Sequence, residues 1–165
     1  MRIGVISDTH GHADLTLRAI RMLESLEVEQ VLHCGDIGSE EVIRLFDKWP
    51  THFVWGNCDY DRRPLAAAIE RHSTPDSPKT LHEEFGELDL AGARVALLHS
   101  HDRAKFRQTI DSGDYDLVCY GHTHVAAVDR HGETVVLNPG AVYRANPHSV
   151  AIVELPACDA QVIEL

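Results

Sequence analysis

Apolar residues in the first third of the chain form short runs that alternate with amphipathic segments. The runs are rich in Val, Ile and Leu, which is typical of strands buried on both faces. Between them, apolar side chains recur at i, i+4 and i+7, the spacing of a helix with one buried face. Five elements follow: strands over residues 2–7, 30–34 and 51–55, and helices over residues 13–26 and 40–46, the second with Ser39 as N-cap. This order predicts right-handed crossovers and a parallel sheet.

The remainder of the chain predicts shorter elements. Gly86 and Gly92 mark turns beside two short strands, and residues 130–132 mark a hairpin. The expected elements are helices over residues 65–72 and 104–110, and strands over residues 80–84, 87–90, 95–98, 117–120, 125–129, 135–137, 151–154 and 161–163. The last two strands form an antiparallel pair. No internal repeat, linker or low-complexity segment divides the chain.

The composition is that of one ordinary globular domain. The chain has 165 residues, of which 44% are hydrophobic and 25% charged, and this length suits a single domain over residues 1–165. No apolar run reaches the ~18 residues of a membrane span, and the N-terminus lacks the layout of a signal peptide. These features predict a cytoplasmic protein. The net charge of −11 argues against stable binding to nucleic acid or to an acidic membrane.

The four cysteines do not form a structural zinc module, because none of them makes a C-x-x-C pair. Cys34 and Cys119 fall in apolar strands and are expected to be small core residues. Cys58 instead follows the third strand in a polar loop, so it needs another explanation.

Polar clusters follow the predicted strands at the point where each strand ends. Asp8 and His10 follow the first strand, Asp36 the second, and Asn57 and Asp59 the third. Side chains two apart at a strand end point to the same side, and ligands of parallel sheets bind beyond the carboxyl ends of the strands. Carboxylate, amide and imidazole groups suit Mn, Fe, Co, Ni or Zn. The first cluster alone is equally compatible with a turn and a helix cap.

Together, five such clusters resemble the sequence blocks of the calcineurin-like metallophosphoesterase superfamily. The blocks are Asp8-Thr9-His10, Gly35-Asp36, Gly56-Asn57-Cys58-Asp59, His99 and Gly121-His122-Thr123-His124. The short length and Asn138-Pro139-Gly140 resemble the small bacterial and archaeal phosphodiesterase branch. The resemblance implies an α/β fold, a two-sheet mixed β-sandwich flanked by helices in four α/β/β/α layers.

The resemblance also implies roles for the matched residues. Asp8, His10, Asp36 and His124 would hold one divalent ion, and Asp36, Asn57, His99 and His122 a second, with Asp36 shared. Manganese is the expected metal, with nickel, iron, cobalt or zinc as alternatives. The two ions would activate a bridging hydroxide and bind two phosphoryl oxygens. The implied catalytic residues are Asp36, Asn57, Asp59 and His101, and the implied substrate contacts are Asn57, Cys58 and His101.

Two positions depart from the family pattern. Cys58 occupies the place of a histidine that assists the leaving group, although its partner Asp59 is retained. Ser100 stands where the family commonly has glycine, which puts close approach of the substrate there in doubt. His101 is equally compatible with a phosphate contact and with a solvent-facing loop residue.

The expected function is hydrolysis of a small or nucleotide-like phosphodiester by a cytoplasmic enzyme. The branch that the chain resembles often forms dimers, which implies a homodimer here. One alternative is a phosphomonoesterase, against which Cys58 counts because a poor leaving group needs an acid. Another is a non-catalytic scaffold, as in the sorting subunit of the retromer coat that resembles this family. The second alternative is disfavoured because every matched ligand position holds a competent residue. No partner other than the small substrate is expected.

Overall fold

The first sheet contains the parallel strands that the sequence predicts. The computed structural model describes residues 1–165, and this sheet has the strand order β11-β10-β1-β2-β3-β4. The strands β1 to β4 pair in parallel, whereas β10 pairs antiparallel with both β1 and β11. Their bounds are Arg2–Ile6 (β1), Gln30–His33 (β2), Thr51–Phe53 (β3), Lys79–Leu81 (β4), Ser149–Glu154 (β10) and Asp159–Glu164 (β11).

Three helices cover one face of this sheet: α1 (Ala13–Ser25), α2 (Glu40–Arg44) and α3 (Arg62–Arg71). As expected, Ser39 caps α2, and its Oγ accepts a hydrogen bond from the Val42 amide at 3.4 Å. The helices and the sheet enclose a core of 19 buried residues that includes Leu23, Phe46 and Trp55. Burial of this apolar face provides most of the driving force for packing the helices on the sheet.

The second sheet has the strand order β5-β6-β7-β9-β8. The pairs β6–β7 and β7–β9 are parallel, and β5–β6 and β8–β9 are antiparallel. The bounds are Phe85–Leu90 (β5), Ala93–Leu98 (β6), Leu117–Tyr120 (β7), Ala127–His131 (β8) and Thr134–Asn138 (β9). The expected hairpin and the expected terminal antiparallel pair are both confirmed.

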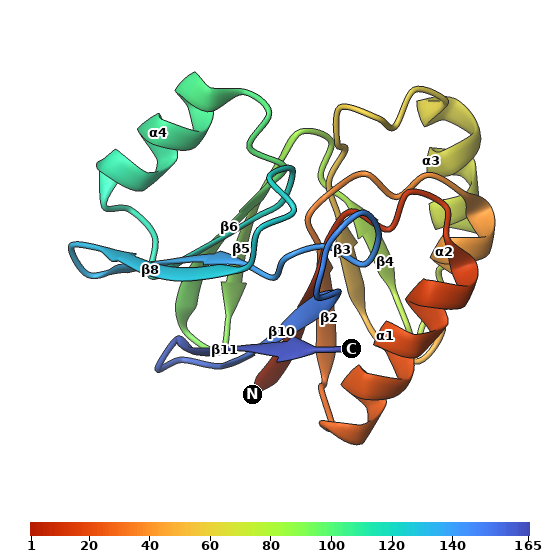
Figure 1. The fold of residues 1–165 in the computed structure, drawn as a ribbon, viewed down its shortest axis with the longest axis horizontal. Coiled ribbons are helices and arrows are strands. Elements are labelled where there is room, and N and C mark those ends of the chain that lie inside the picture. Colours follow the sequence, from red (N-terminus) through yellow and green to blue (C-terminus); the bar gives the residue numbers. More distant parts are fainter.

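The two sheets pack face to face between the helices (Figure 1). A second core of 17 buried residues, with Val5, Leu97 and Leu137 among them, lies between the sheets. The fourth helix, α4 (Arg103–Ser112), covers the outer face of the second sheet, where a small cluster forms around Leu98 and Val118. The expected four-layer α/β/β/α sandwich is therefore confirmed.

The segment between β4 and β5 differs from the expected pair of strands joined by a turn. Gly86 lies inside β5, opposite Leu97, and β4 and β5 belong to different sheets. The chain crosses from one sheet to the other here, and Glu83 anchors the crossing: its carbonyl accepts from the Trp55 amide at 2.7 Å and its carboxylate from the indole at 2.9 Å. A turn signal alone does not say which sheet the next strand joins.

Two helices extend beyond their expected bounds. α3 begins at Arg62 rather than at residue 65, and α4 ends at Ser112 rather than at residue 110. Asp102 caps α4 by accepting from the amides of Ala104 and Lys105, and Gly113 ends the helix with φ of 67°, a left-handed conformation that costs glycine little. None of the helices has both the length and the apolar character that crossing a bilayer requires.

Candidate metal centre

The strand-end clusters meet at one edge of the sandwich. Asp8 and His10 lie between β1 and α1, Asp36 between β2 and α2, and Asn57 between β3 and α3. The second sheet adds three histidines from the loops after β6 and β7, namely His99, His122 and His124. The carboxyl ends of the central parallel strands therefore bring together residues more than 100 positions apart, as expected for this class of sheet.

The backbone at these positions is not that of a strand end, which corrects the alternation argument for Asp8 and His10. β1 ends at Ile6, and Asp8 and His10 have φ of 56° and 46°. Asp36, His122 and His124 also lie in the left-handed region, with φ of 55°, 80° and 59°. Such conformations cost non-glycine residues roughly 1–3 kcal/mol each and cluster at functional sites. The side chains converge because the backbone reverses at each loop.

Three glycines make room for the cluster. A Cβ on Gly56 would collide with the Asp36 carboxylate, and one on Gly121 would collide with the Ser7 hydroxyl. Gly35 is required for two reasons. Its φ of 97° lies in the left-handed region, and a Cβ would lie 2.7 Å from the His99 ring. The glycines at positions 56 and 121 are therefore required for space rather than for a left-handed turn.

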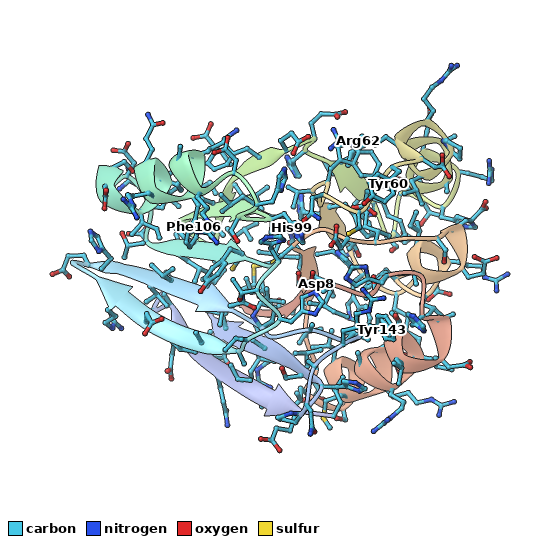
Figure 2. The ribbon with its side chains drawn as sticks, turned by 45° about the horizontal axis from the view of Figure 1, so that its top comes forward. Asp8, Tyr60, Arg62, His99, Phe106 and Tyr143 are labelled. Atoms are coloured by element: carbon cyan, nitrogen blue, oxygen red, sulfur yellow. The ribbon has the colours of Figure 1, made fainter.

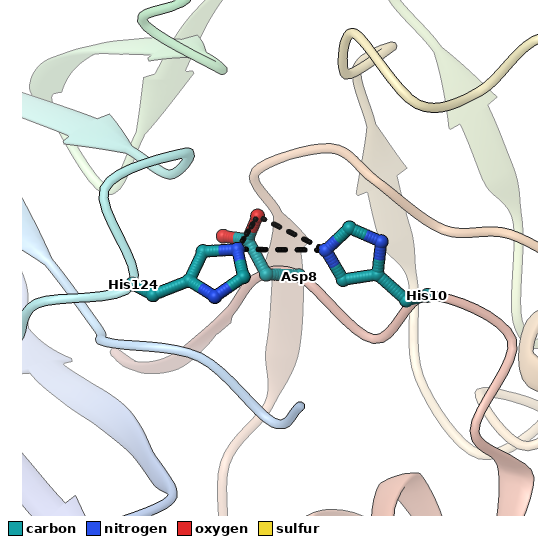
Figure 3. Close-up of side chains that lie close together, drawn as sticks. All are labelled: Asp8, His10 and His124. Atoms are coloured by element: carbon teal, nitrogen blue, oxygen red, sulfur yellow. Dashed lines mark hydrogen bonds and ion pairs between the residues drawn. The ribbon is translucent and has the colours of Figure 1, made fainter. Parts of the chain in front are cut away.

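The Asp8 carboxylate has one satisfied and one unsatisfied oxygen. Its Oδ2 accepts from the Ser7 hydroxyl at 2.5 Å and from the His122 amide at 3.1 Å. Its Oδ1 is buried and has no hydrogen-bond donor. That oxygen faces the Nε2 atoms of His124 and His10 at 3.1 and 3.7 Å (Figure 3). A buried anionic oxygen without a donor is costly unless a cation compensates it.

The neutral ring of His124 does not supply that donor, although the Asp8 carboxylate raises the pKa of His124 and so favours the protonated ring, whose Nε2–H would donate. Its Nδ1 lies 3.3 Å from the Arg144 carbonyl oxygen. A carbonyl only accepts, so Nδ1 carries the hydrogen and the Nε2 of the neutral ring presents a lone pair. Two lone pairs then face each other across 3.1 Å, between His124 Nε2 and Asp8 Oδ1. A backbone partner that orients a histidine in this way is typical of metal ligands.

His99 repeats the arrangement on the other side of the site. Its Nδ1 lies 2.7 Å from the Cys34 carbonyl oxygen, so the Nε2 of the neutral ring also presents a lone pair. That Nε2 is 3.1 Å from Asn57 Oδ1 and 3.3 Å from Asp36 Oδ2. Asp36 Oδ2 is also 3.6 Å from His10 Nε2, so this one oxygen lies between the two histidines.

The charges of the cluster are strongly coupled. Burial would raise the pKa of Asp36, but the His99 ring and the Cys58 amide hold it well below its usual range. Burial would lower the pKa of His99, but the Asp36 and Asp8 carboxylates raise it. The carboxylates thus remain ionised and attract positive charge to the imidazoles.

This donor set fits divalent metal ions. Three groups of ligand atoms lie within 4.8 Å of one another: Asp8 with His10 and His124, Asp8 with Asp36 and His99, and His10 with Asp36 and Cys58. Each contains a carboxylate and an imidazole, which suit transition metals. The unsatisfied Asp8 oxygen lies in two of the three groups. Neither proton nor hydrogen-bond donor from the protein fills that position when the histidines are neutral.

Some residues of the expected site stand apart from these groups. His122 is exposed, and its ring centroid lies 5.2 Å from that of His99. His101 is also exposed, with its Nε2 3.6 Å from a Glu84 carboxylate oxygen. Asp59 is buried and accepts from the backbone amides of Gly38 at 3.0 Å and Gly56 at 2.8 Å. Asp59 therefore ties two of the ligand-bearing loops together rather than contacting the Cys58 side chain.

Cys58 lies inside the centre. Its amide donates to Asp36 Oδ1 at 2.7 Å, and the Asn57 side-chain amide lies 3.4 Å from its sulfur. Burial raises the pKa of the thiol, and Asp36 raises it further. Without a metal ion the group is a neutral thiol, so it differs from a histidine in both charge and reach.

The Ser100 side chain is hydrogen-bonded to a neighbouring loop. Its φ is 69°, which explains why glycine is favourable at this position. Its hydroxyl donates to the Gly121 carbonyl at 2.9 Å and is buried. This hydrogen bond links the loops after β6 and β7, and it offsets part of the backbone strain.

His33, which no sequence pattern singled out, links the loops that carry the proposed ligands. His33 is fully buried; its Nδ1 accepts from the Gly35 amide at 3.3 Å, so its Nε2–H donates to the Thr9 hydroxyl at 3.0 Å. Thr9 in turn donates to the Ile37 carbonyl at 3.0 Å. This chain joins the loop of Asp8 to the loop of Asp36. The only signal in the sequence was a histidine in an otherwise apolar strand.

Comparison with known proteins places the arrangement in a family. Residues 1–157 match the model of the calcineurin-like phosphoesterase superfamily domain. The chain is 31% identical over 142 residues to a phosphodiesterase of Methanocaldococcus jannaschii, covering 85% of this chain and 83% of that protein.

Solved structures agree in fold. An archaeal phosphodiesterase superimposes with a TM-score of 0.90 at 28% identity, covering 100% of both chains. Vps29 of Entamoeba histolytica superimposes with a TM-score of 0.67 at 17% identity, covering 100% of this chain and 99% of the other. The second likeness, at that identity, concerns the fold alone.

Proposed function

Because the chain belongs to the calcineurin-like phosphoesterase superfamily, we propose that it is a metal-dependent phosphodiesterase acting on a small or nucleotide-like phosphodiester. The observation that carries the proposal is the unsatisfied Oδ1 of Asp8, which faces the Nε2 atoms of His124 and His10 at 3.1 and 3.7 Å. A purely structural cluster would provide a donor for a buried carboxylate oxygen. A centre built to receive cations leaves it open.

Two divalent ions are proposed, with Asp36 shared between them. Asp8, His10 and His124 would complete the first ligand set, and Asn57, His99 and His122 the second. Asn57 contributes a neutral oxygen, so the second set holds fewer negative charges and repels an anionic phosphodiester less. Mn²⁺ suits this set of oxygen and nitrogen donors, as do Ni²⁺, Fe²⁺, Co²⁺ and Zn²⁺.

When bound, such ions supply Lewis acidity, which lowers the pKa of a water and neutralises phosphoryl oxygens. The protein's own residues provide the rest. The carbonyls of Cys34 and Arg144 keep His99 and His124 in the ligand tautomer. Asp59 and His33 hold the loops in register through backbone contacts. The exposed His101 would contact a phosphoryl oxygen. These groups position a diester without undergoing chemical change themselves.

The test is hydrolysis after controlled removal and return of metal. The protein is stripped with a chelator, checked by elemental analysis, and reloaded with Mn²⁺, Ni²⁺ or Zn²⁺. We expect two ions per chain, no hydrolysis of bis(4-nitrophenyl) phosphate by the stripped protein, and recovery on reloading. The diester should be hydrolysed faster than 4-nitrophenyl phosphate.

Each alternative gives a different result. Equal or faster hydrolysis of the monoester would favour a phosphomonoesterase. Metal binding without hydrolysis of either ester would favour a non-catalytic role. Failure to bind any divalent ion would contradict the proposed centre itself.

A further inference from the structure

A cavity of about 500 Å³ opens beside the metal centre, between α4 and the outer face of the second sheet. It is the size of pockets that hold a nucleotide-sized group. Its walls come from α4, from Tyr120 at the end of β7 and from the loops after β6 and β7. The mechanism proposed above does not use this cavity.

The cavity borders the proposed metal centre. His122, itself a proposed metal ligand, lines it, and so does Ser100. Ser100 follows His99 directly, and the His122 ring lies beside the His99 ring at 5.2 Å between centroids. A diester whose phosphorus lies at the centre would therefore have one substituent close enough to extend into the cavity.

Aromatic side chains form the apolar part of the cavity. The Phe106 and Tyr120 rings lie 4.5 Å apart between centroids and are tilted by 45°. Figure 2 shows Phe106 on the α4 side of His99, whereas Tyr60 and Arg62 lie on the opposite side. Both rings are only partly buried, so they retain surface on which a flat group of a substrate can pack. A base ring gains roughly 1–3 kcal/mol from such stacking.

The charged residues of the cavity favour an anion. Arg103 and Arg107 both line it from α4 and are exposed. The one acidic side chain in the lining, Asp111, lies 3.3 Å from His131, which is also in the lining. No ion pair engages either arginine within the described residues 1–165. The protein has a net charge of −11, so two guanidinium groups without ion-pair partners at one cavity favour the binding of an anionic group there.

We propose that this cavity binds one ester arm of the substrate, and that the arm carries an aromatic ring and a further phosphate group. Phe106 and Tyr120 pack against the ring, and Arg103 and Arg107 bind the phosphate. The inference rests on the proposed phosphodiesterase function and narrows its substrate class to diesters with a nucleotide-type arm. Diesters with two small arms are then poor substrates.

Three diesters with the same leaving group test the proposal, because they differ only in the retained arm. The leaving group is 4-nitrophenolate, and the arm is methyl, adenosine joined through its 5′ oxygen, or the same adenosine bearing a 3′-phosphate. We expect kcat/KM of the manganese-loaded protein to rise in that order. Each step should raise kcat/KM about tenfold, which corresponds to the free energy of one stacking contact or one charge-assisted hydrogen bond.

Two variants show how much of the gain in kcat/KM comes from the phosphate contact and how much from the ring contact. Arg107→Gln should remove about tenfold from kcat/KM for the phosphate-bearing substrate relative to the adenosine substrate, mostly through KM. Tyr120→Leu should reduce the step between methyl and adenosine. Arg63→Gln is the matched control, since Arg63 is an exposed arginine on α3, on the other side of the molecule. It should leave all three ratios unchanged.

Calorimetric binding of adenosine 3′,5′-bisphosphate to the manganese-loaded protein separates the two proposals, because it does not require turnover. Binding that Arg107→Gln weakens about tenfold supports the cavity even if no diester is hydrolysed. If all three diesters are hydrolysed at equal kcat/KM and the bisphosphate binds the variant and the parent protein equally, the cavity proposal is overturned while the phosphodiesterase function stands.

Discussion

The Nε2 atom of His124 lies 3.1 Å from the Oδ1 atom of Asp8, and neither atom carries a hydrogen when the imidazole is neutral. The two residues are held in this position by separate contacts: the Arg144 carbonyl orients the ring, and the Ser7 hydroxyl and His122 amide orient the carboxylate. A buried carboxylate oxygen without a donor lowers the stability of the metal-free protein, and a bound cation would compensate for that cost. This trade-off is directly measurable.

Asp8→Asn should stabilise the metal-free protein and remove most of its response to metal. The asparagine oxygen can keep the contacts with Ser7 and the His122 amide, while its NH₂ group donates to His124. We expect a gain of about 1 kcal/mol in the free energy of unfolding without metal at pH 9. The parent protein should gain ~2.7 kcal/mol when an ion is present at 100 times its dissociation constant.

Thermal unfolding with and without Mn²⁺ measures both effects. The parent melting temperature should rise on loading, and that of Asp8→Asn should rise less. A variant that is less stable than the parent without metal, yet is stabilised equally by Mn²⁺, would show that the Asp8 oxygen is not a ligand.

Asp36→Asn should lower activity more than any change of an exposed acid. Its Oδ2 lies between His10 and His99, so a neutral amide there weakens both proposed ligand sets. Changes to mere neighbours of metal ligands cost about 10–100-fold, and we expect a loss at least that large in kcat/KM for bis(4-nitrophenyl) phosphate. Glu41→Gln, an exposed acid on α2, is the control and should stay within twofold. Near-parent hydrolysis with two ions bound to Asp36→Asn would refute the shared position.

Ser100→Gly should be more stable than Ser100→Ala. Both variants lose the hydrogen bond to the Gly121 carbonyl, worth about 1 kcal/mol. Only glycine relieves the left-handed φ of 69°, which should return about 1 kcal/mol. Denaturant unfolding should therefore place Ser100→Gly near the parent and Ser100→Ala about 1 kcal/mol below it. Equal stabilities of the two variants would mean that the backbone at this position is not strained.

His33 should make the protein acid-sensitive. Burial lowers the pKa of His33 to about 3, whereas the unfolded chain takes up a proton near pH 6.5. Below that pH the unfolded state binds more protons, so stability falls as pH falls, by about 2 kcal/mol between pH 7 and pH 5. In His33→Gln this contribution disappears, although the variant loses packing at every pH. Unfolding free energies of the chelated proteins at both pH values give the comparison, and an unchanged pH slope would rule the explanation out.

Cys58→His should selectively accelerate esters with poor leaving groups. A thiol is a weak proton donor at pH 7, and burial raises its pKa further. General acid help is worth roughly 10²–10⁴-fold for a basic leaving group and little for nitrophenolate. We expect faster hydrolysis of 2′,3′-cyclic nucleotides by the variant, with a much smaller change for bis(4-nitrophenyl) phosphate. An equal loss on both substrates would instead indicate that Cys58 is a packing residue whose replacement disturbs the loop.

The sequence by itself determined the family blocks, most of the elements and the identity of the proposed ligands. Local patterns carry this information: the β-branched runs before Asp8 and Asp36 predict strands, and the polar residues after them cannot be core. The alternation of strands and helices then predicts that β1, β2 and β3 pair in parallel, because the helices between them form right-handed crossovers. Even Ser39 as a helix cap was readable, because capping depends on neighbours in sequence.

Only the tertiary structure decided how the ligands converge. His10 and His124 are 114 positions apart, and the hydrophobic pattern did not predict the left-handed backbone at either residue. Their tautomers depend on distant carbonyls such as that of Arg144, and the role of His33 depends on a hydroxyl 24 positions away. The cavity under α4 also depends on packing, because Arg107 and Tyr120 line one cavity only when the helix covers the second sheet. Interactions between distant segments are set by packing, which periodicity and spacing along one chain do not encode.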